Sequence, residues 1–304
     1  MTVYRKDGRE LSKSKEYGFL RSKPGSGIFT CPICGQSMER GEHTYRCQSG
    51  HCFDIAKEGY VNLLPANRRH SDAPGDDKNM VNARTRFLSG GWYDPLRNEL
   101  KRLAEKYLPE KGTLIDAGCG EGYYTEVLSS VTVGKGGAAG GIDLSKAAAK
   151  KAAKRCCNAE IAVASVYHMP LADQSADLLT DCFAPLALEE YYRVLRPGGV
   201  FLYVVPGRKH LWEMKEVLYE HPYVNEQKTE EYAGFGMIEE TPLEFICNLG
   251  SGEDISALFQ MTPYAWKTPR DGIEHLLEYR ELKITAQFRI FAFERKTEQY
   301  ITQS

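Results

Sequence analysis

Residues 31–51 contain three cysteines and a histidine at the spacing C-x2-C-x12-C-x3-H, formed by Cys31, Cys34, Cys47 and His51. Two cysteines separated by two residues lie on one tight turn, so both thiolates can face one ion. Three thiolates and one imidazole complete a tetrahedron around Zn²⁺ and leave no open position. A segment of about 40 residues buries too little apolar surface to fold alone, so a metal would supply the missing free energy. The pattern therefore predicts a small zinc-held head on a larger body.

Two alternatives accompany this prediction. The four residues can share the spacing by chance, as unrelated core residues. Cys52 can also replace its neighbour His51 as the fourth ligand. A closed site of four protein ligands supports a structural role for the zinc and not a catalytic one.

Length, cysteine content and hydropathy limit the class of protein. A chain of 304 residues suits one large and one small domain. No apolar run reaches the roughly 18 residues of a membrane span, and the polar stretch from Met1 to Gly27 is unlike a signal peptide. Nine cysteines, an odd number, suit reduced thiols in the cytoplasm better than a secreted disulfide framework.

Charge is distributed unevenly along the chain. Residues 1–90 carry a net positive charge and the remainder a net negative charge. A basic head suits contact with phosphates, and a solvated mixed surface is the alternative. Basic residues that could contact phosphates follow the zinc motif: Arg68, Arg69, Lys78, Arg84 and Arg86.

Beyond residue 113 the pattern alternates between buried strands and amphipathic helices, which predicts an α/β fold with a parallel sheet covered on both faces. The late segment 282–294 alternates like a strand with one wet face. Earlier in the chain, Lys23 to Gly27 reads as a flexible joint, and the apolar residues from Phe53 to Leu64 suit a small ribbon of strands in the head. The expected strands of the body are 114–116, 138–143, 161–163, 178–180, 200–205 and 243–247, and the expected helices are 80–89, 96–108, 123–130, 145–157, 186–195, 211–219 and 251–260.

The first strand of the body runs into a glycine-rich loop, Asp116-Ala-Gly118-Cys-Gly120-Glu-Gly122. Glycine is needed where the backbone turns sharply or approaches a ligand closely, although a simple strand-to-helix turn is the alternative. Asp143 follows the second strand, where a carboxylate can bind a ribose diol. Capping of the helix that begins near Ser145 is the alternative role for Asp143.

This loop resembles motif I of the S-adenosylmethionine-dependent methyltransferases, since its glycines fall at every second position. Leu195-Arg-Pro197-Gly198-Gly199 before a strand is similar to the same superfamily. The late alternating strand would be its antiparallel seventh strand. The resemblance favours a methyl donor over a dinucleotide.

A narrower resemblance covers residues 30–295. It rests on Cys31-Pro-Ile-Cys34, on Phe53 to Pro65, on Ala83 to Leu88, on Gly118 to Thr125 and on Pro206 to Leu211. These segments resemble the RlmA family, the 23S rRNA (guanine-N1) methyltransferases. The resemblance implies Zn²⁺ on Cys31, Cys34, Cys47 and His51. It implies S-adenosylmethionine contacts from Tyr93, Asp116, Gly118, Gly120, Gly122, Tyr124, Thr125, Asp143 and His210.

The fold implied by the resemblance is a class I S-adenosylmethionine-dependent methyltransferase sheet with a small N-terminal zinc-binding domain. We expect an N-terminal extension over residues 1–28, a zinc-binding RNA-recognition domain over 29–66, a linker over 67–95 and the methyltransferase domain over 96–304. The partner implied is a 23S rRNA hairpin, with a homodimer left open. The family has branches that modify neighbouring guanines, one of them linked with macrolide resistance, and this sequence does not decide between them.

Guanine N1 carries a proton near neutral pH, so methylation needs that proton removed or polarised. Tyr93, His168, Asp181 and His210 are candidate groups, of which Asp181 and His210 are our predicted catalytic residues. Phe183 could stack on a flipped base, or belong to the core. A small-molecule methyltransferase of the quinone type and a non-catalytic RNA-binding adaptor are the alternative functions.

Overall fold

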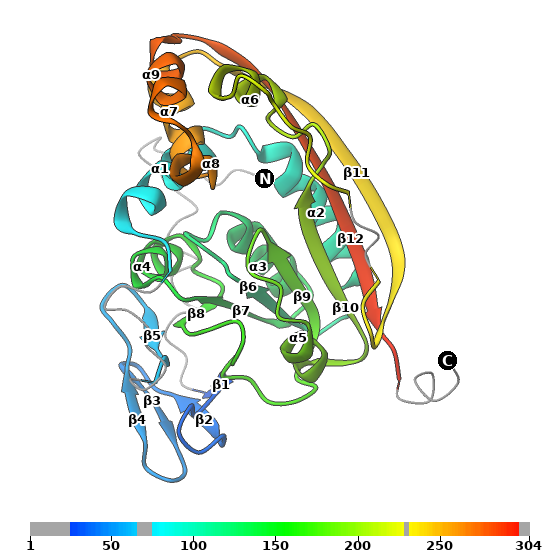
Figure 1. Ribbon diagram of the computed structural model, residues 1–304. Helices are drawn as coiled ribbons and strands as arrows, with labels where there is room; N and C mark the ends of the chain where they lie inside the picture. Colours follow the sequence, from blue (N-terminus) through cyan, green and yellow to red (C-terminus); the bar gives the residue numbers. More distant parts are fainter. Residues whose placement is uncertain (1–24, 66–74, 228–230, 298–304) are drawn as a thin grey trace, which may run out of the picture.

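The computed structural model describes residues 25–65, 75–227 and 231–297, and these form two β-sheets (Figure 1). The smaller sheet is antiparallel and makes up the N-terminal head. Its strands, in spatial order, are β1 (Gly25–Thr30), β2 (Ser37–Arg40), β3 (Thr44–Cys47) and β4 (Cys52–Asp54). The larger sheet has eight strands in the order β11-β12-β10-β9-β6-β7-β8-β5.

Most strands of the larger sheet are parallel, and one inserted strand runs the other way. The parallel strands are β5 (Tyr60–Asn62), β6 (Thr113–Ala117), β7 (Ala138–Asp143), β8 (Glu160–Val163), β9 (Ala176–Cys182) and β10 (Leu195–Pro206). The late strand β12 (Leu282–Arg295) is antiparallel to both β10 and β11 (Phe235–Leu249). The predicted α/β fold with an antiparallel late strand is confirmed.

Successive side chains of the central strands face opposite layers, as the pleat requires. On one face, Leu114 and Leu178 share a core with α2 (Asp94–Tyr107) and α3 (Tyr123–Gly134). On the other face, Ile115 and Leu179 share a core with α5 (Leu188–Val194) and with the zinc head. Helix α4 (Lys146–Arg155) packs against β7 and β8.

The connection from β8 to β9, residues 164–175, contains no helix that could cover the sheet. The zinc head packs on that face of the sheet instead. Strand β1 lies against β7, where a Cβ on Gly140 would collide with the side chain of Ile28. The Glu160 carboxylate on β8 accepts a 2.6 Å hydrogen bond from the Tyr45 hydroxyl and a 3.3 Å hydrogen bond from the Ile28 N–H. Head and body are therefore joined through a shared core and partly buried polar contacts.

Two expectations about the head were wrong. Tyr60–Asn62 does not complete a ribbon within the head, because it pairs in parallel with β8 and forms the edge of the larger sheet. Gly25 to Gly27 is not a joint, because these residues begin β1. The predicted N-terminal extension lies largely outside the described residues.

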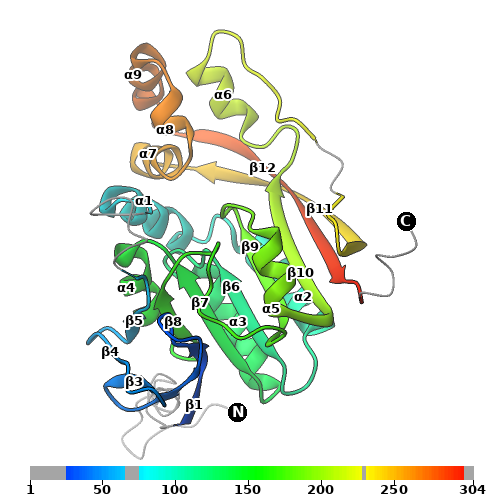
Figure 2. The same ribbon diagram turned by 60° about the horizontal axis from the view of Figure 1, so that its bottom comes forward.

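Strands β11 and β12 extend beyond the rest of the sheet and carry a helical cap (Figure 2). The pairing of β10 with β12 ends at Pro206–Phe288, whereas the pairing of β11 with β12 continues to Leu249–Leu282. The cap helices are α1 (Lys78–Ser89), α6 (Trp212–Leu218), α7 (Gly252–Gln260), α8 (Tyr264–Lys267) and α9 (Arg270–Glu278). Among the described helices, none is long and apolar enough to cross a membrane.

Candidate active site and zinc centre

The glycine loop lies at the carboxyl end of β6, next to the carboxyl ends of β7 and β9. Gly118, Gly120 and Gly122 all adopt left-handed backbone conformations, with φ of 75°, 55° and 88°. A Cβ on Gly118 would collide with Ala184, and a Cβ on Gly122 would lie 2.7 Å from the Cys156 Sγ. Those two glycines are required by close packing within the protein. Gly120 has open space instead, since only an Arg84 nitrogen at 4.0 Å is near its Cβ direction, so a ligand can approach the backbone there.

Asp143 closes the end of β7 beside this loop. Its carboxylate accepts hydrogen bonds from the Gly120 N–H at 2.9 Å and the Ser145 N–H at 2.7 Å. Helix α4 is capped by the Ser145 hydroxyl, which accepts from the Ala148 N–H, so Asp143 is not the capping residue. Burial raises the pKa of Asp143 to about 6, although both backbone hydrogen bonds act to lower it. The carboxylate keeps lone pairs for further donors such as hydroxyl groups.

Asp116 and Thr125 lie beneath the loop and do not line it. The Asp116 carboxylate accepts hydrogen bonds from the hydroxyls of Thr125 and Thr180, and all three residues are buried. Burial raises the pKa of Asp116. This network fixes the position of the loop, so any action of Asp116 and Thr125 on a ligand is indirect.

Two buried tyrosines stand near the loop. The Tyr124 hydroxyl is buried and has no hydrogen-bond partner among the described residues. Such a group is costly to leave unpaired, which favours a polar ligand at this position. Tyr93 is buried between Phe87 and Phe288, with ring centroids 5.1 Å away in each case. Burial raises the pKa of both tyrosines, so neither is poised to ionise.

His210 is buried against Phe288, with ring centroids 4.6 Å apart. Its Nδ1 accepts a 3.2 Å hydrogen bond from the Gln287 N–H, and burial lowers its pKa to about 3. The neutral ring therefore carries its proton on Nε2. His210 can donate a hydrogen bond to a ligand, but the structure argues against the predicted role of proton acceptor.

Asp181 is fully buried at the end of β9, and burial raises its pKa to about 7. Its two oxygens accept from the Tyr191 hydroxyl at 2.8 Å and from the Ala184 N–H at 2.9 Å. Both oxygens therefore bind donors within the protein, and the carboxylate stabilises the loop after β9 that contains Ala184. His168 lies elsewhere, exposed on the connection between β8 and β9.

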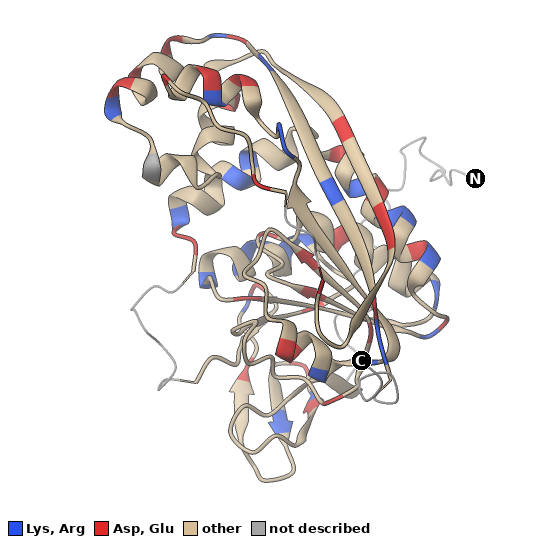
Figure 3. Ribbon diagram, turned by 45° about the vertical axis from the view of Figure 1, so that its right-hand side comes forward, with Lys and Arg blue, Asp and Glu red and all other residues tan. Residues whose placement is uncertain are grey.

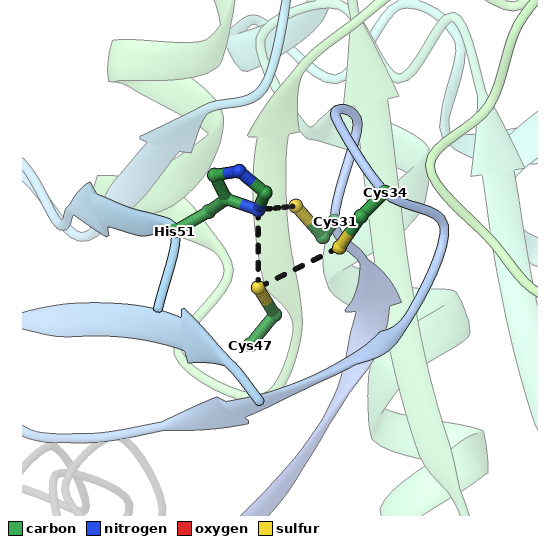
Figure 4. Close-up of side chains that lie close together, drawn as sticks. All are labelled: Cys31, Cys34, Cys47 and His51. Carbon is green, nitrogen blue, oxygen red and sulfur yellow. Dashed lines mark hydrogen bonds between the residues drawn. The ribbon is translucent and has the colours of Figure 1, made fainter. Parts of the chain in front are cut away.

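Four metal-binding side chains meet in the head (Figure 4). The ligand atoms of Cys31, Cys34, Cys47 and His51 lie within 4.8 Å of one another, although the residues come from two separate turns. Cys47 Sγ and His51 Nδ1 are 3.4 Å apart. The sequence left Cys52 open as a ligand, but its exposed thiol is outside this group and contacts Arg46.

The two zinc turns have the same construction. Each closes with a backbone hydrogen bond, Gly35 N–H to Cys31 oxygen in one and Gly50 N–H to Cys47 oxygen in the other. Both glycines have left-handed φ values, 73° and 84°, which explains why glycine directly follows Cys34 and directly precedes His51. The Gln36 side chain joins the turns, accepting from the Ser49 N–H and hydroxyl.

The arginines predicted to contact phosphates already have protein partners. Arg84 pairs with Asp76, and Arg86 pairs with Glu253 at 2.6 Å and with Asp254 at 3.4 Å. Arg68 and Arg69 lie outside the described residues. Figure 3 shows basic and acidic residues interspersed over several of the described helices, whereas α1 and α4 carry basic residues and no acidic ones. The structure therefore does not support Arg84 and Arg86 as free phosphate contacts.

The strand order, the glycine loop and the acid after the next strand define a class I S-adenosylmethionine-dependent methyltransferase, here with a zinc ribbon. The zinc-ribbon family "RlmA, N-terminal" matches residues 29–72, and a methyltransferase-domain family matches residues 115–203. YxjB of Bacillus subtilis, named as a 23S rRNA (guanine-N(1)-)-methyltransferase, is 31% identical over 86% of this chain and 95% of its own. The 23S rRNA (guanine(748)-N(1))-methyltransferase of Streptomyces fradiae is 37% identical over 62% of this chain and 66% of its own. The chain belongs to the RlmA family of 23S rRNA (guanine-N1) methyltransferases, with S-adenosylmethionine and Zn²⁺ as cofactors.

Proposed function

We propose that this protein transfers the methyl group of S-adenosylmethionine to N1 of a guanine in a hairpin of 23S rRNA, in the cytoplasm. The observation that supports this most directly is that the zinc ribbon and the methyltransferase sheet share one hydrophobic core. A head fixed in this way can hold RNA at a constant position relative to the glycine loop. The tip of the first zinc turn is exposed, with Ile33 64% accessible to solvent.

The residues at the carboxyl ends of the strands fit the methyl donor. The open approach at Gly120 suits the nucleoside, and the Asp143 carboxylate suits its ribose hydroxyls. The unpaired Tyr124 hydroxyl and the Nε2–H of His210 offer polar contacts to the amino-acid end, within an apolar wall that includes Tyr93. Asp116 and Thr125 hold the loop from below. Gly118 and Gly122 allow the backbone of the glycine loop to adopt left-handed conformations.

The zinc ligands in this proposal are Cys31, Cys34, Cys47 and His51, which leave no position for substrate. The recognition domain then spans residues 29–66, except that its last strand, β5, belongs to the larger sheet. The catalytic domain spans residues 96–304. The expected linker, 67–95, contains helix α1 of the cap, which packs against α7, and it reaches the first residues of α2.

The bound donor supplies a sulfonium methyl that is already activated, so the protein mainly aligns guanine N1 with it and excludes water. The described site offers a buried aromatic wall for this purpose, formed by Tyr93, Phe288 and the partly buried Phe245. The lone pair of guanine N1 forms the new bond to the methyl carbon as the carbon–sulfur bond breaks, S-adenosylhomocysteine is the leaving group, and the N1 proton is released to solvent. His210, whose Nδ1 already accepts a hydrogen bond from the Gln287 N–H, contributes a hydrogen bond from Nε2–H in this proposal.

The test is methylation in vitro with radiolabelled S-adenosylmethionine, comparing unmodified 23S rRNA, tRNA and a small-molecule extract. We expect label in 23S rRNA and a reverse-transcription stop at one guanine, because N1-methylguanine cannot form a Watson–Crick pair. S-adenosylhomocysteine should suppress the reaction. Label confined to tRNA or to small molecules would overturn the proposal.

A further inference from the structure

Phe183 has a strained backbone at the edge of the glycine loop. Its φ is 66°, in the left-handed region that a bulky aromatic residue rarely adopts. Strain of this kind persists where the surrounding structure enforces it, and it is concentrated at functional sites. The residue follows β9 directly, so it stands where the parallel strands end.

The strained conformation is held from both sides. On one side, Asp181 binds the Ala184 N–H and is itself held by the Tyr191 hydroxyl. On the other side, Ala184 packs so closely on Gly118 that no Cβ fits there. The loop that carries Phe183 is thus fixed directly against the loop proposed to bind the methyl donor.

The side chain of Phe183 is not used by the core. It is 47% exposed, although a phenylalanine normally gains free energy from burial. One contact of its ring is with Phe288, whose centroid is 5.6 Å away, and Phe288 in turn contacts His210 and Tyr93. An exposed ring therefore borders the aromatic wall of the donor site.

We propose that Phe183 is the platform on which the target guanine stacks after it leaves the RNA helix, and that Asp181 and Tyr191 are positioning residues that fix this platform. The inference rests on the proposed function and deepens it. A purine has a π-face that stacks well on a phenyl ring, and an extruded base needs such a partner to replace its lost neighbours. Asp181 acts through the loop, which accounts for its two protein donors.

The first experiment varies the ring. Phe183→Trp, Phe183→Leu and Phe183→Gly are compared on unmodified 23S rRNA transcript for kcat, for KM of the RNA and for Kd of S-adenosylmethionine. Phe183→Trp should stay within about threefold of wild type, and the other two should lose about 10- to 100-fold in kcat, in line with the loss of one stacked base. Donor affinity should not change.

The matched control is Met237→Ala. Met237 is 55% exposed and lies at the start of the edge strand β11, where it pairs with Phe293 of β12. Strands β12 and β10 separate β11 from β9, the strand that Phe183 follows. Removal of the Met237 side chain should change neither kcat nor melting temperature. Wild-type kcat in Phe183→Leu or in Phe183→Gly would overturn the stacking role.

Thermal stability separates function from packing. Glycine adopts the left-handed region freely, so Phe183→Gly should keep or raise the melting temperature while it lowers kcat. A lowered melting temperature together with unchanged kcat would assign the ring to packing and overturn the proposal.

The second experiment tests the positioning pair. Tyr191→Phe removes one donor from Asp181 and should lower kcat without changing donor affinity. If the pair acts through the platform, Tyr191→Phe should have no further effect in the Phe183→Leu background. Equal losses in both backgrounds would overturn the positioning role.

The two proposals fail in different ways. If wild-type protein labels no guanine N1 in 23S rRNA, the proposed function is wrong whatever the variants do. If wild-type protein labels it and Phe183→Leu labels it equally fast, only the stacking role is wrong.

Discussion

The protonation state of Asp143 should affect both the stability of the fold and the binding of the methyl donor. An acid whose pKa is raised by burial is stabilised by folding in its protonated form. Its pKa moves from the ordinary 3.8 to about 6, so this residue favours the folded state at low pH and loses that contribution as the pH rises through 6. Binding of hydroxyl groups has the opposite dependence, because it needs the ionised acceptor.

We therefore expect the affinity for S-adenosylmethionine to be constant above about pH 7 and to weaken as the pH falls through 6. Asp143→Asn should weaken binding at pH 8 by about 5- to 150-fold, corresponding to about 1–3 kcal/mol for the charged acceptor. It should also remove the pH dependence. Calorimetric titration at several pH values measures both effects.

Asp173→Asn is the control for this titration, because Asp173 is an exposed acid that forms an ion pair with Arg193 on the surface. It should keep the wild-type affinity and pH profile. If Asp143→Asn also keeps both, Asp143 only braces Gly120 and Ser145.

Residue roles were harder to predict than residue positions. The sequence selects Asp181 and His210, and both lie near the aromatic wall or its loop. Their roles depend on which of their atoms already has a partner. For Asp181 the partner that decides this is Tyr191, 10 residues later, and for His210 it is the Gln287 backbone, 77 residues later. Tertiary contacts of this kind decide whether a histidine accepts or donates, and no local pattern records them.

At the scale of elements, the zinc turns were predictable because their ligands and glycines are local. The metal should be tested with Cys47→Ser against Cys52→Ser. Metal analysis should find about one zinc in wild type and in Cys52→Ser, and much less in Cys47→Ser, since only Cys47 belongs to the ligand group. Cys47→Ser should also melt several degrees lower and bind S-adenosylmethionine more weakly, because β1 packs on β7, which ends at Asp143.

Equal zinc content in the two variants would contradict the ligand set. Intact donor affinity in zinc-free Cys47→Ser would instead show that the head and the donor site are independent.

Other elements were missed for physical reasons. Strand β5 was assigned to the head because three residues carry too little pattern to reveal a partner about 100 residues later. Helices α8 and α9 are short and separated by Thr268-Pro269, so each offers few residues in which a helical pattern can be recognised. The longer alternating strands and helices of the sheet followed the expected pattern closely, since burial on two faces imposes it.

At the scale of the whole molecule, one core contains side chains of both the head and the sheet. We expect a single cooperative thermal transition for the zinc-loaded protein, with equal calorimetric and van't Hoff enthalpies. Chelation of zinc should lower the temperature of this transition. Two separate transitions in the zinc-loaded protein would show that the head is an independent unit.

The position of β5 also has a consequence for synthesis of the chain. Tyr60 leaves the ribosome well before Ile161, the residue with which it pairs. The zinc turns need only local residues and can close early, whereas the strand behind them must wait for the sheet to exist. We therefore expect the head to form first, and β5 to pair with β8 at the edge of the sheet in the final step of folding.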